Sequence, residues 1–317
     1  MFDIGELREA QAVVGKHMQP TAQIAWPLLA QRLGAQAWVK HENHNPTGAF
    51  KVRGGLTYVD HLVRYSGAVS LVTATRGNHG QSIALAGGLY GVPVTIVVPI
   101  GNSVEKNAAM RAYGAELIEH GRDFDASRDE ARRLSGERGA LMVPSFDRNL
   151  VVGVATYALE LLTAIPDLDL LYVPIGLGSG IVGCIMVRDL LGLKTRIIGV
   201  QSTGAPSYAL SFAAGHPVPT NDAVTNADGM ATRVPDPVAV EMINKGADRI
   251  VTVSDDEVAE AIRIYWSDTH NLAEGGGAAA LAAALQERER IQGKKVGLVL
   301  SGGNIDAALF QSWLYPG

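Results

Sequence analysis

The chain has 317 residues, of which 47% are hydrophobic and 19% are charged, and its formal net charge is −5. These values predict an enzyme-sized globular protein with one large or two smaller hydrophobic cores. The acidic balance and the lack of any run of Lys or Arg exclude the basic surface that nucleic acid or anionic lipid requires, so we expect neither as a partner.

The cysteine content and the N-terminus indicate the compartment. The single cysteine, Cys184, excludes an internal disulfide framework and a cysteine-rich zinc site. The first residues include Asp3 and Glu6 and lack the basic start and apolar stretch of an export signal. We therefore expect a cytoplasmic protein.

In chain order, the first unusual stretch is GAFKVRGG, residues 48–55, which places Lys51 between apolar residues. A buried lysine is costly unless it is paired or neutral, and desolvation lowers its pKa and makes the amine reactive. A surface lysine at the start of a helix explains these eight residues equally well.

Short apolar, β-rich runs alternate with Ala- and Leu-rich helical patterns along the rest of the chain. Strands that are apolar on both faces and alternate with helices are typical of parallel sheets covered by helices, and they predict an α/β fold. The charged segment 122–138 fits a solvated helix face. The runs that we predict as strands are residues 68–75, 92–99, 170–175, 196–202, 248–254 and 295–300.

The segment 170–187 contains no charged residue and approaches the length of a short transmembrane helix. Pro174 and four glycines between residues 176 and 183 interrupt it. This pattern predicts a strand, a loop and a helix. We therefore expect no membrane span.

Ligands of parallel sheets bind beyond the carboxyl ends of the strands, so the loops after strands are candidate sites. Three such loops have unusual sequences, namely TRGNHGQS (75–82), GLGSGIVG (176–183) and LSGGN (300–304). The glycine loop before a helix suits a phosphate, because its backbone N–H groups can approach an anion. In the other two loops, helix capping alone would explain the polar side chains.

A dinucleotide site competes for the glycine loop, because Gly178, Gly180 and Gly183 satisfy the G-x-G-x-x-G pattern. That fingerprint also requires an acidic residue at the end of the next strand, which here ends in Gln201 and Ser202. We therefore disfavour a nicotinamide enzyme. An apolar-flanked lysine, a phosphate loop and polar strand ends together match the needs of pyridoxal phosphate.

Seven motifs occur in the order found in a known family. They are NPTGAFKVRGG (45–55), TRGNHGQ (75–81), VPSFD (143–147), PIGLGSG (174–180), ADGMA (227–231), AEGGGAA (273–279) and SGGN (301–304). On these motifs, which cover nearly the whole chain, the sequence resembles the fold type II pyridoxal-phosphate enzymes, specifically the serine/threonine dehydratase and serine racemase group.

The resemblance implies a tryptophan synthase β-like fold with two domains, each a mainly parallel sheet covered by helices. It implies a large cofactor-binding domain formed by residues 1–44 and 149–317 and a small domain formed by residues 45–148. It also implies a homodimer that acts on a small amino-acid substrate.

The resemblance assigns roles position by position. It implies that Lys51 is catalytic, because it matches the lysine that forms a Schiff base with the cofactor and then removes the Cα proton. The other implied contacts of pyridoxal 5′-phosphate are Phe50 beside the ring, Asn78 at O3′, Ser301 at the pyridine nitrogen and Glu274 nearby. The implied phosphate loop is Gly176, Leu177, Gly178, Ser179 and Gly180, and the implied substrate-binding residues are Thr75, Arg76, Gly77 and His79.

The implied activity is the conversion of a β-hydroxy-α-amino acid, by default L-threonine or L-serine, to a 2-oxo acid and ammonia. One alternative is a dehydratase for a larger or acidic substrate, such as phenylserine or 3-hydroxyaspartate. Another is a protein that binds an amino acid or the cofactor without catalysis. The intact set of Lys51, Asn78 and Ser301 argues against the second alternative.

Arg76 departs from the family pattern, since racemases of this group carry a serine there that acts as a second base. A guanidinium is always protonated and cannot accept a proton, which disfavours racemase-like activity. Arg76 either forms a surface ion pair or holds a substrate carboxylate in a bidentate fork. The sequence leaves open whether that carboxylate is the α-carboxylate or a side-chain acid.

A second departure concerns metals. Relatives that bind a divalent cation carry Glu and Asp at the positions of Gln201 and Ser207, and hard cations prefer carboxylates. His41 and His44 lack the H-E-x-x-H spacing of a zinc site. We therefore predict no metal site.

Overall fold

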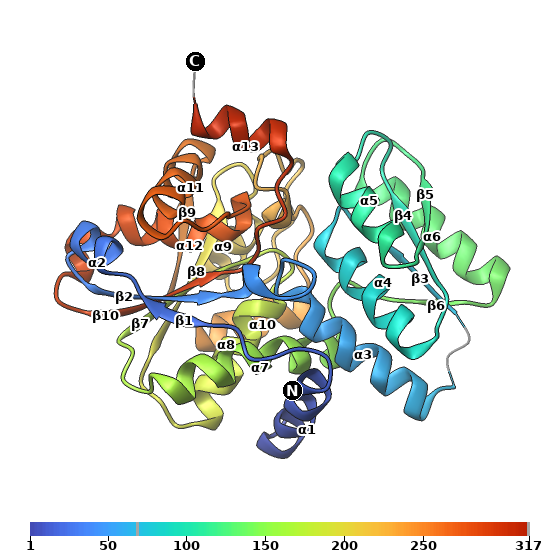
Figure 1. The fold of residues 1–317 in the computed structure, drawn as a ribbon, viewed down its shortest axis with the longest axis horizontal. Helices are drawn as coiled ribbons and strands as arrows, with labels where there is room; N and C mark the ends of the chain where they lie inside the picture. Colours follow the sequence, from blue (N-terminus) through green and yellow to red (C-terminus); the bar gives the residue numbers. More distant parts are fainter. Residues whose placement is uncertain (68–69, 316–317) are drawn as a thin grey trace.

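The computed structural model describes residues 1–67 and 70–315. They form two α/β parts, each built on its own sheet (Figure 1). The α/β fold with parallel sheets is therefore confirmed. The predicted strand 68–75 begins with two residues outside the described ones, and its described part contains the strand β3 (Leu71–Ala74).

The larger sheet has six strands. In spatial order they are β1 (Gln23–Ala25), β2 (Gln36–His41), β10 (Lys295–Leu300), β7 (Leu170–Pro174), β8 (Arg196–Ser202) and β9 (Arg249–Val253). β1 is antiparallel to β2, and all other neighbours are parallel. β10 lies between β2 and β7 and pairs Leu300 with His41, so segments from the two ends of the chain meet in the middle of the sheet.

The smaller sheet has four parallel strands. In spatial order they are β5 (Glu116–Glu119), β4 (Val94–Val98), β3 and β6 (Leu141–Met142). All residues of β3 and β4 are buried, as expected of central strands covered on both faces. The helices of this part are α3 (Lys51–Tyr65), α4 (Asn78–Tyr90), α5 (Val104–Ala112) and α6 (Phe124–Arg138). Figure 1 shows α3 running from the boundary between the two parts beneath the smaller sheet.

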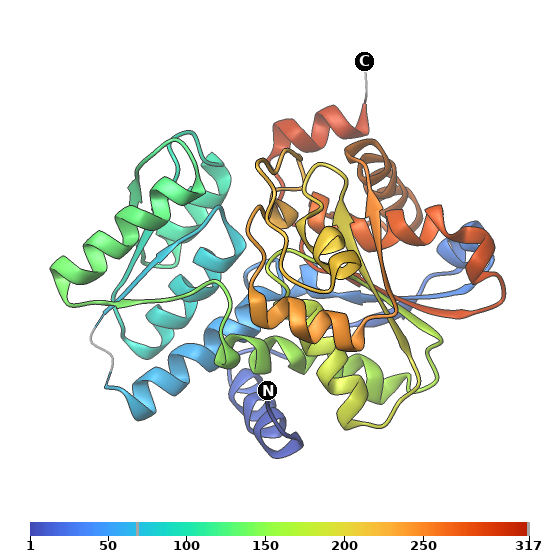
Figure 2. The same ribbon diagram turned by 180° about the vertical axis from the view of Figure 1, so that it is seen from behind.

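We propose the domain boundaries expected above, namely 45–148 for the small domain and 1–44 with 149–317 for the large one. The four strands of the smaller sheet lie within the first range, and the six strands of the larger sheet lie within the other two. Figure 2 shows the same division from behind.

The larger sheet is covered by helices on both faces. They are α1 (Ile4–Gly15), α2 (Pro27–Leu33), α7 (Arg148–Ala164), α8 (Ser179–Leu190), α9 (Ser207–Ala214), α10 (Pro237–Gly246), α11 (Asp255–Thr269), α12 (Gly275–Gln286) and α13 (Ala307–Leu314), with the 3-10 turns η1 (Glu42–His44), η2 (Asp228–Met230) and η3 (Arg288–Ile291). β7, a loop and α8 occupy the apolar segment 170–187 as predicted. In the part of the chain that the structure describes, no helix is both long and apolar enough to cross a membrane.

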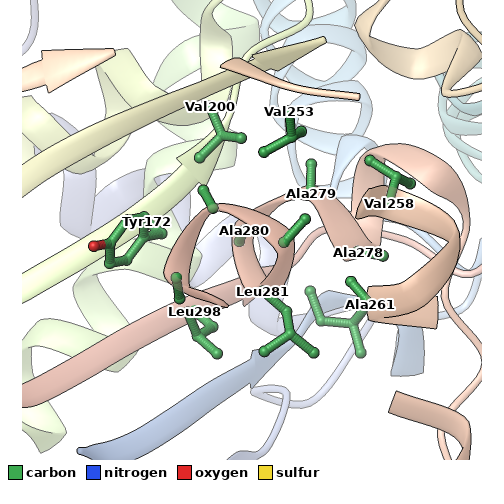
Figure 3. Packing of buried hydrophobic residues seen from close by; sticks show 14 of the residues in the cluster. Tyr172, Val200, Val253, Val258, Ala261, Ala278, Ala279, Ala280, Leu281 and Leu298 are labelled. Atoms are coloured by element: carbon green, nitrogen blue, oxygen red, sulfur yellow. The ribbon is translucent and has the colours of Figure 1, made fainter. Parts of the chain in front are cut away.

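The core of the larger part forms around α12. This helix is apolar on all sides and is buried from Gly275 to Ala284, as expected of a helix enclosed by protein. Its alanines and Leu281 pack against Val200, Val253 and Leu298 of the sheet and against α11 (Figure 3). This packing fixes the start of α12, which follows the predicted site residue Glu274.

A buried cluster of four charged side chains anchors α3 to the larger part. Arg53 donates to Glu42 at 2.7 Å and to Glu160 of α7 at 2.6 and 2.9 Å. Lys40 of β2 donates to Glu160 at 2.5 Å. Arg53, Lys40 and Glu42 are fully buried. Two cations thus meet two carboxylates, the arrangement that makes buried charge tolerable.

Candidate active site

A cavity of about 900 Å³ lies between the two parts of the molecule. It is lined by the loops that follow strands β3, β7 and β10 and by the start of α3. All fourteen residues that the sequence indicated line this one cavity: Phe50, Lys51, Thr75, Arg76, Gly77, Asn78, His79, Gly176, Leu177, Gly178, Ser179, Gly180, Glu274 and Ser301. The parallel strands therefore bring together residues that are far apart in the sequence.

Lys51 is the first residue of α3 and projects its amine into the cavity wall. Its Nζ donates to Ser179 Oγ at 3.3 Å and lies 5.1 Å from the centroid of the Phe50 ring. Burial lowers the pKa of the Lys51 amine to about 8. A substantial neutral fraction therefore exists near neutral pH, and a neutral amine is both a nucleophile and a base.

The loop before α8 forms an anion cradle. In the part of the chain that the structure describes, the N–H groups of residues 176–180 have no acceptor, and α8 begins without a side-chain cap. Gly178 has φ 97°, and a Cβ at Gly176 would lie 2.4 Å from the Gly229 oxygen, so both positions require glycine. The Leu177 carbonyl accepts a hydrogen bond from the Tyr208 hydroxyl at 2.9 Å.

Asn78 lies at the start of α4 and is held by two neighbours. Its Nδ2 donates to Glu274 Oε1 at 2.6 Å, and its Oδ1 accepts from Asn304 Nδ2 at 2.8 Å. Asn304 also donates to the Thr47 carbonyl at 2.7 Å. Asn304 belongs to the SGGN motif, but its positioning role depends on tertiary contacts that the motif alone does not reveal.

Glu274 is a buried carboxyl group with one unsatisfied oxygen. Among the described residues, its Oε2 has no hydrogen-bond partner. Burial raises the pKa of Glu274 to about 7, with Asp228 acting in the same direction and Lys106 and Asn78 opposing it. The group therefore carries a proton over part of the neutral range.

Lys106 and Asp228 bridge the cavity between the two parts. Lys106 of α5 donates to Asp228 of η2 at 2.6 Å. Burial lowers the pKa of Lys106, but Glu274 and Asp228 outweigh it and the net direction is upward. The sequence did not predict the contact between Lys106 and Asp228, because the two residues are far apart in the sequence and Lys106 lies in an ordinary helical pattern.

The remaining predicted residues shape the loop after β3 or the end of β10. Thr75 Oγ1 accepts from the N–H groups of Gly77 at 3.0 Å and Gly80 at 3.3 Å. His79 is buried, and burial with a smaller effect of Lys51 lowers its pKa to about 3, so its imidazole is neutral. Ser301 is buried, and its carbonyl accepts from the Phe50 N–H at 2.9 Å.

Gln201 and Ser207, which replace the metal-binding Glu and Asp of some relatives, form hydrogen bonds within the chain. Gln201 Oε1 accepts from the Ala209 N–H at 2.9 Å, and Ser207 Oγ donates to the Thr232 carbonyl at 2.7 Å. Within residues 1–67 and 70–315, no group of three or more His, Cys, Asp or Glu side chains is placed to hold a metal. The absence of a metal site stays a prediction.

The sequence matches the family described as "Pyridoxal-phosphate dependent enzyme" over residues 14–302. The chain belongs to this family. The family membership predicted from the seven motifs is thus confirmed, and pyridoxal phosphate is the cofactor.

Relatives of this pyridoxal-phosphate-dependent enzyme include lyases and racemases. The L-threonine ammonia-lyase of Thermotoga maritima is 33% identical in an alignment that covers 100% of this chain and 79% of the relative. The L-threo-3-hydroxyaspartate ammonia-lyase of Saccharomyces cerevisiae is 33% identical, with 95% of this chain and 93% of the relative covered. The structure of maize serine racemase superimposes with a TM-score of 0.91 at 28% identity, covering 98% and 96% of the two chains.

The cavity of this pyridoxal-phosphate-dependent enzyme fits its cofactor. The cradle at 176–180 offers backbone donors to a phosphate, because the N–H groups of these residues have no acceptor among the described residues. Lys51 supplies an amine of lowered pKa beside that cradle. The buried Glu274 Oε2 leaves a polar atom for which the described residues provide no partner.

Replacing Glu274 by glutamine tests the raised pKa. In the wild-type protein the folded state keeps the proton between the ordinary pKa of 4.5 and about 7, while the unfolded state loses it, so this group destabilises the fold as pH rises over that range. Glutamine has no such titration and still accepts from Asn78. We expect the melting temperature of Glu274→Gln, relative to wild type, to increase from pH 5 to pH 7 and then level off.

Glu289→Gln is the matched control, because Glu289 is exposed. Its melting temperature relative to wild type should not change over the same pH range. Differential scanning fluorimetry in a constant-ionic-strength buffer series makes the measurement. A difference for Glu274→Gln that stays flat or falls with pH would contradict the assignment.

Proposed function

We propose that the chain is an ammonia-lyase that converts a β-hydroxy-α-amino acid, first of all L-threonine or L-serine, to a 2-oxo acid and ammonia. The observation that carries the proposal is the placement of the Lys51 amine, with its lowered pKa, beside Ser179 in a cavity that also contains the anion cradle. In the net reaction the hydroxyl group leaves Cβ, the Cα proton is removed, and water replaces the amino group.

Lys51 is proposed as the residue that bonds the cofactor and then moves the proton at the substrate Cα. The cofactor, when bound, withdraws electron density from Cα and so weakens the C–H bond. The neutral Lys51 amine accepts the proton, and its apolar neighbour Phe50 limits access of water on that side. The N-terminal position of Lys51 on α3 is fixed by the buried cluster around Arg53.

The other site residues are proposed to hold the cofactor and to orient the substrate. Residues 176–180 would hold the phosphate through backbone N–H groups. Ser301 would contact the pyridine nitrogen, and its hydroxyl, unlike a carboxylate, does not keep that nitrogen protonated. Asn78 would contact O3′ of the cofactor, because Glu274 and Asn304 fix its amide. Thr75, Arg76, Gly77 and His79 would border the substrate.

Racemase-like activity is disfavoured by the same cavity. A second base would be needed on the opposite face of the substrate, and Arg76 lies at the position implied for it. A guanidinium cannot accept a proton. His79 is a nearby side chain that could accept a proton, but it is buried at the second position of α4.

A substrate panel tests the lyase proposal. The holoenzyme is assayed for 2-oxo acid with both stereoisomers at each carbon of threonine, serine, phenylserine and 3-hydroxyaspartate. We expect turnover of L-isomers at a rate on the order of 1–1000 per second. L-2-aminobutyrate, which lacks the leaving hydroxyl, is the matched control and should give none. Full cofactor occupancy without turnover of any β-hydroxy amino acid would refute the proposal.

We also propose a homodimer and a cytoplasmic location. The first rests on the resemblance to the dehydratase and racemase group, and the second on the single buried cysteine, which suits a reducing compartment. Light scattering coupled to size exclusion would test the dimer directly.

A further inference from the structure

Arg76 is a cation of the cavity that has no carboxylate partner among residues 1–67 and 70–315. It lies directly after Thr75 in the loop that follows β3, lines the cavity and is exposed. Within the described ranges its guanidinium makes neither an ion pair nor a hydrogen bond to the chain. A planar group with five donors is therefore available to a ligand.

The other arginines of the cavity, and Lys106, are each paired with a carboxylate. The pairs are Lys106 with Asp228 at 2.6 Å, Arg128 with Asp125 at 2.9 Å, Arg132 with Asp129 at 3.2 Å, Arg122 with Asp123 at 3.5 Å, and Arg233 with Asp125. Asp228 is thereby neutralised, so it does not repel an anionic ligand. Arg76 differs from these residues, because no described carboxylate pairs with it.

The same loop offers a second anion-binding group, separate from Arg76. α4 has 13 residues and begins at Asn78, and no described side chain caps it. Elsewhere in the described chain there is no acceptor for the N–H groups of Asn78 and His79, whereas those of Gly77 and Gly80 are taken by Thr75. Unused N–H groups at a helix N-terminus suit one carboxylate. A monocarboxylic substrate would therefore leave Arg76 unused.

We infer that Arg76 binds a second carboxylate, which makes β-hydroxy-α-amino dicarboxylic acids, in place of the default L-threonine or L-serine, the preferred substrate class. The smallest member is 3-hydroxyaspartate, whose Cβ carries both the leaving hydroxyl and the second carboxylate. Its conversion gives a four-carbon 2-oxo dicarboxylic acid and one ammonia, with no other reactant consumed in the net reaction. A guanidinium holds such a carboxylate through two parallel hydrogen bonds. The inference rests on the proposed lyase function.

The test compares kcat/KM for L-threo-3-hydroxyaspartate and L-threonine in wild type, Arg76→Met and Arg76→Lys. We expect wild type to prefer 3-hydroxyaspartate and Arg76→Met to lose about 10- to 100-fold on that substrate, mainly through KM, with threonine changed by less than about threefold. Lysine keeps the positive charge but cannot form two parallel hydrogen bonds, so Arg76→Lys should lose less kcat/KM on 3-hydroxyaspartate than Arg76→Met. Arg132→Met, which removes an exposed and already paired arginine, should leave the ratio of the two substrates unchanged.

A binding measurement separates recognition from turnover. L-aspartate and L-2-aminobutyrate lack the leaving hydroxyl and differ in the second carboxylate. They are titrated into the holoenzyme while the cofactor absorbance is followed. Wild type should bind aspartate more tightly, and Arg76→Met should bind the two with similar affinity.

Three outcomes are informative. Equal losses on both substrates, or no loss on either, would overturn the second-carboxylate role and leave the lyase function standing. Turnover of threonine without turnover of 3-hydroxyaspartate would do the same. Failure of every β-hydroxy amino acid with cofactor bound would instead remove the lyase function on which the inference rests.

Discussion

Replacing Lys51 by alanine is expected to abolish turnover, by more than about 1000-fold, together with covalent attachment of the cofactor. The cavity contains two lysines, but they differ in protonation. Burial lowers the pKa of Lys51 to about 8, whereas Glu274 and Asp228 hold the pKa of Lys106 above its ordinary value. Only Lys51 therefore presents a neutral amine to an aldehyde near neutral pH.

Borohydride reduction followed by peptide mass spectrometry gives the sharpest measurement. In wild type the cofactor mass should be found on the peptide that contains Lys51 and not on that of Lys106. In Lys51→Ala the label should disappear while the protein stays folded by circular dichroism. A label on Lys106 in either protein, or retained 2-oxo acid formation in Lys51→Ala, would contradict the assignment.

Replacing Arg53 by methionine is expected to lower the free energy of unfolding by about 3–5 kcal/mol. The substitution leaves Glu42 and Glu160 facing only Lys40 in a buried site, and an uncompensated buried charge is costly. Arg132→Met is the control, because Arg132 forms a pair with Asp129 on α6 in which both side chains are exposed, and its loss should cost no more than about 1 kcal/mol.

The pH dependence of the stability loss in Arg53→Met tests whether the buried charge of Glu42 causes it. Burial raises the pKa of Glu42, but Arg53 outweighs it and keeps the pKa below 4.5, so Glu42 stabilises the wild-type fold above that pH. Without Arg53 the burial effect dominates and the charged form becomes unfavourable. The stability deficit of Arg53→Met should thus be largest near pH 7 and shrink below pH 4.5. Equal losses of unfolding free energy for Arg53→Met and Arg132→Met in urea unfolding would refute the role of the cluster.

Much of the fold follows from local sequence. The six runs predicted as strands contain β3, β4, β7, β8, β9 and β10, since central parallel strands are continuously apolar. β5 was not predicted, because its sequence Glu116–Glu119 begins and ends with a charged residue at the sheet edge. β6 has two residues, too few for any periodicity. The pattern rules thus miss short or exposed strands, and they also miss β2, a largely buried strand whose sequence QAWVKH is interrupted by polar residues.

The site was predictable where its residues belong to loops with distinctive glycines or to the motif around Lys51. The contacts that position those residues were not. Lys106 meets Asp228, and Asn304 meets Asn78, only after the two sheets have packed together. The sequence assigned no role to Arg53. Its buried ion pair with Glu160 depends on α7, which lies far from Arg53 in the sequence.

The central place of β10 has a consequence for biosynthesis. All four strands of the smaller sheet have been made once residue 142 is synthesised, so that sheet can form while translation continues. The larger sheet cannot, because β2 and β7 flank a gap that only residues 295–300 fill. Until then the nascent chain presents two open strand edges, which favour pairing with other chains. Ser301 follows immediately, so the proposed cofactor contacts are complete only after residue 301 has been made.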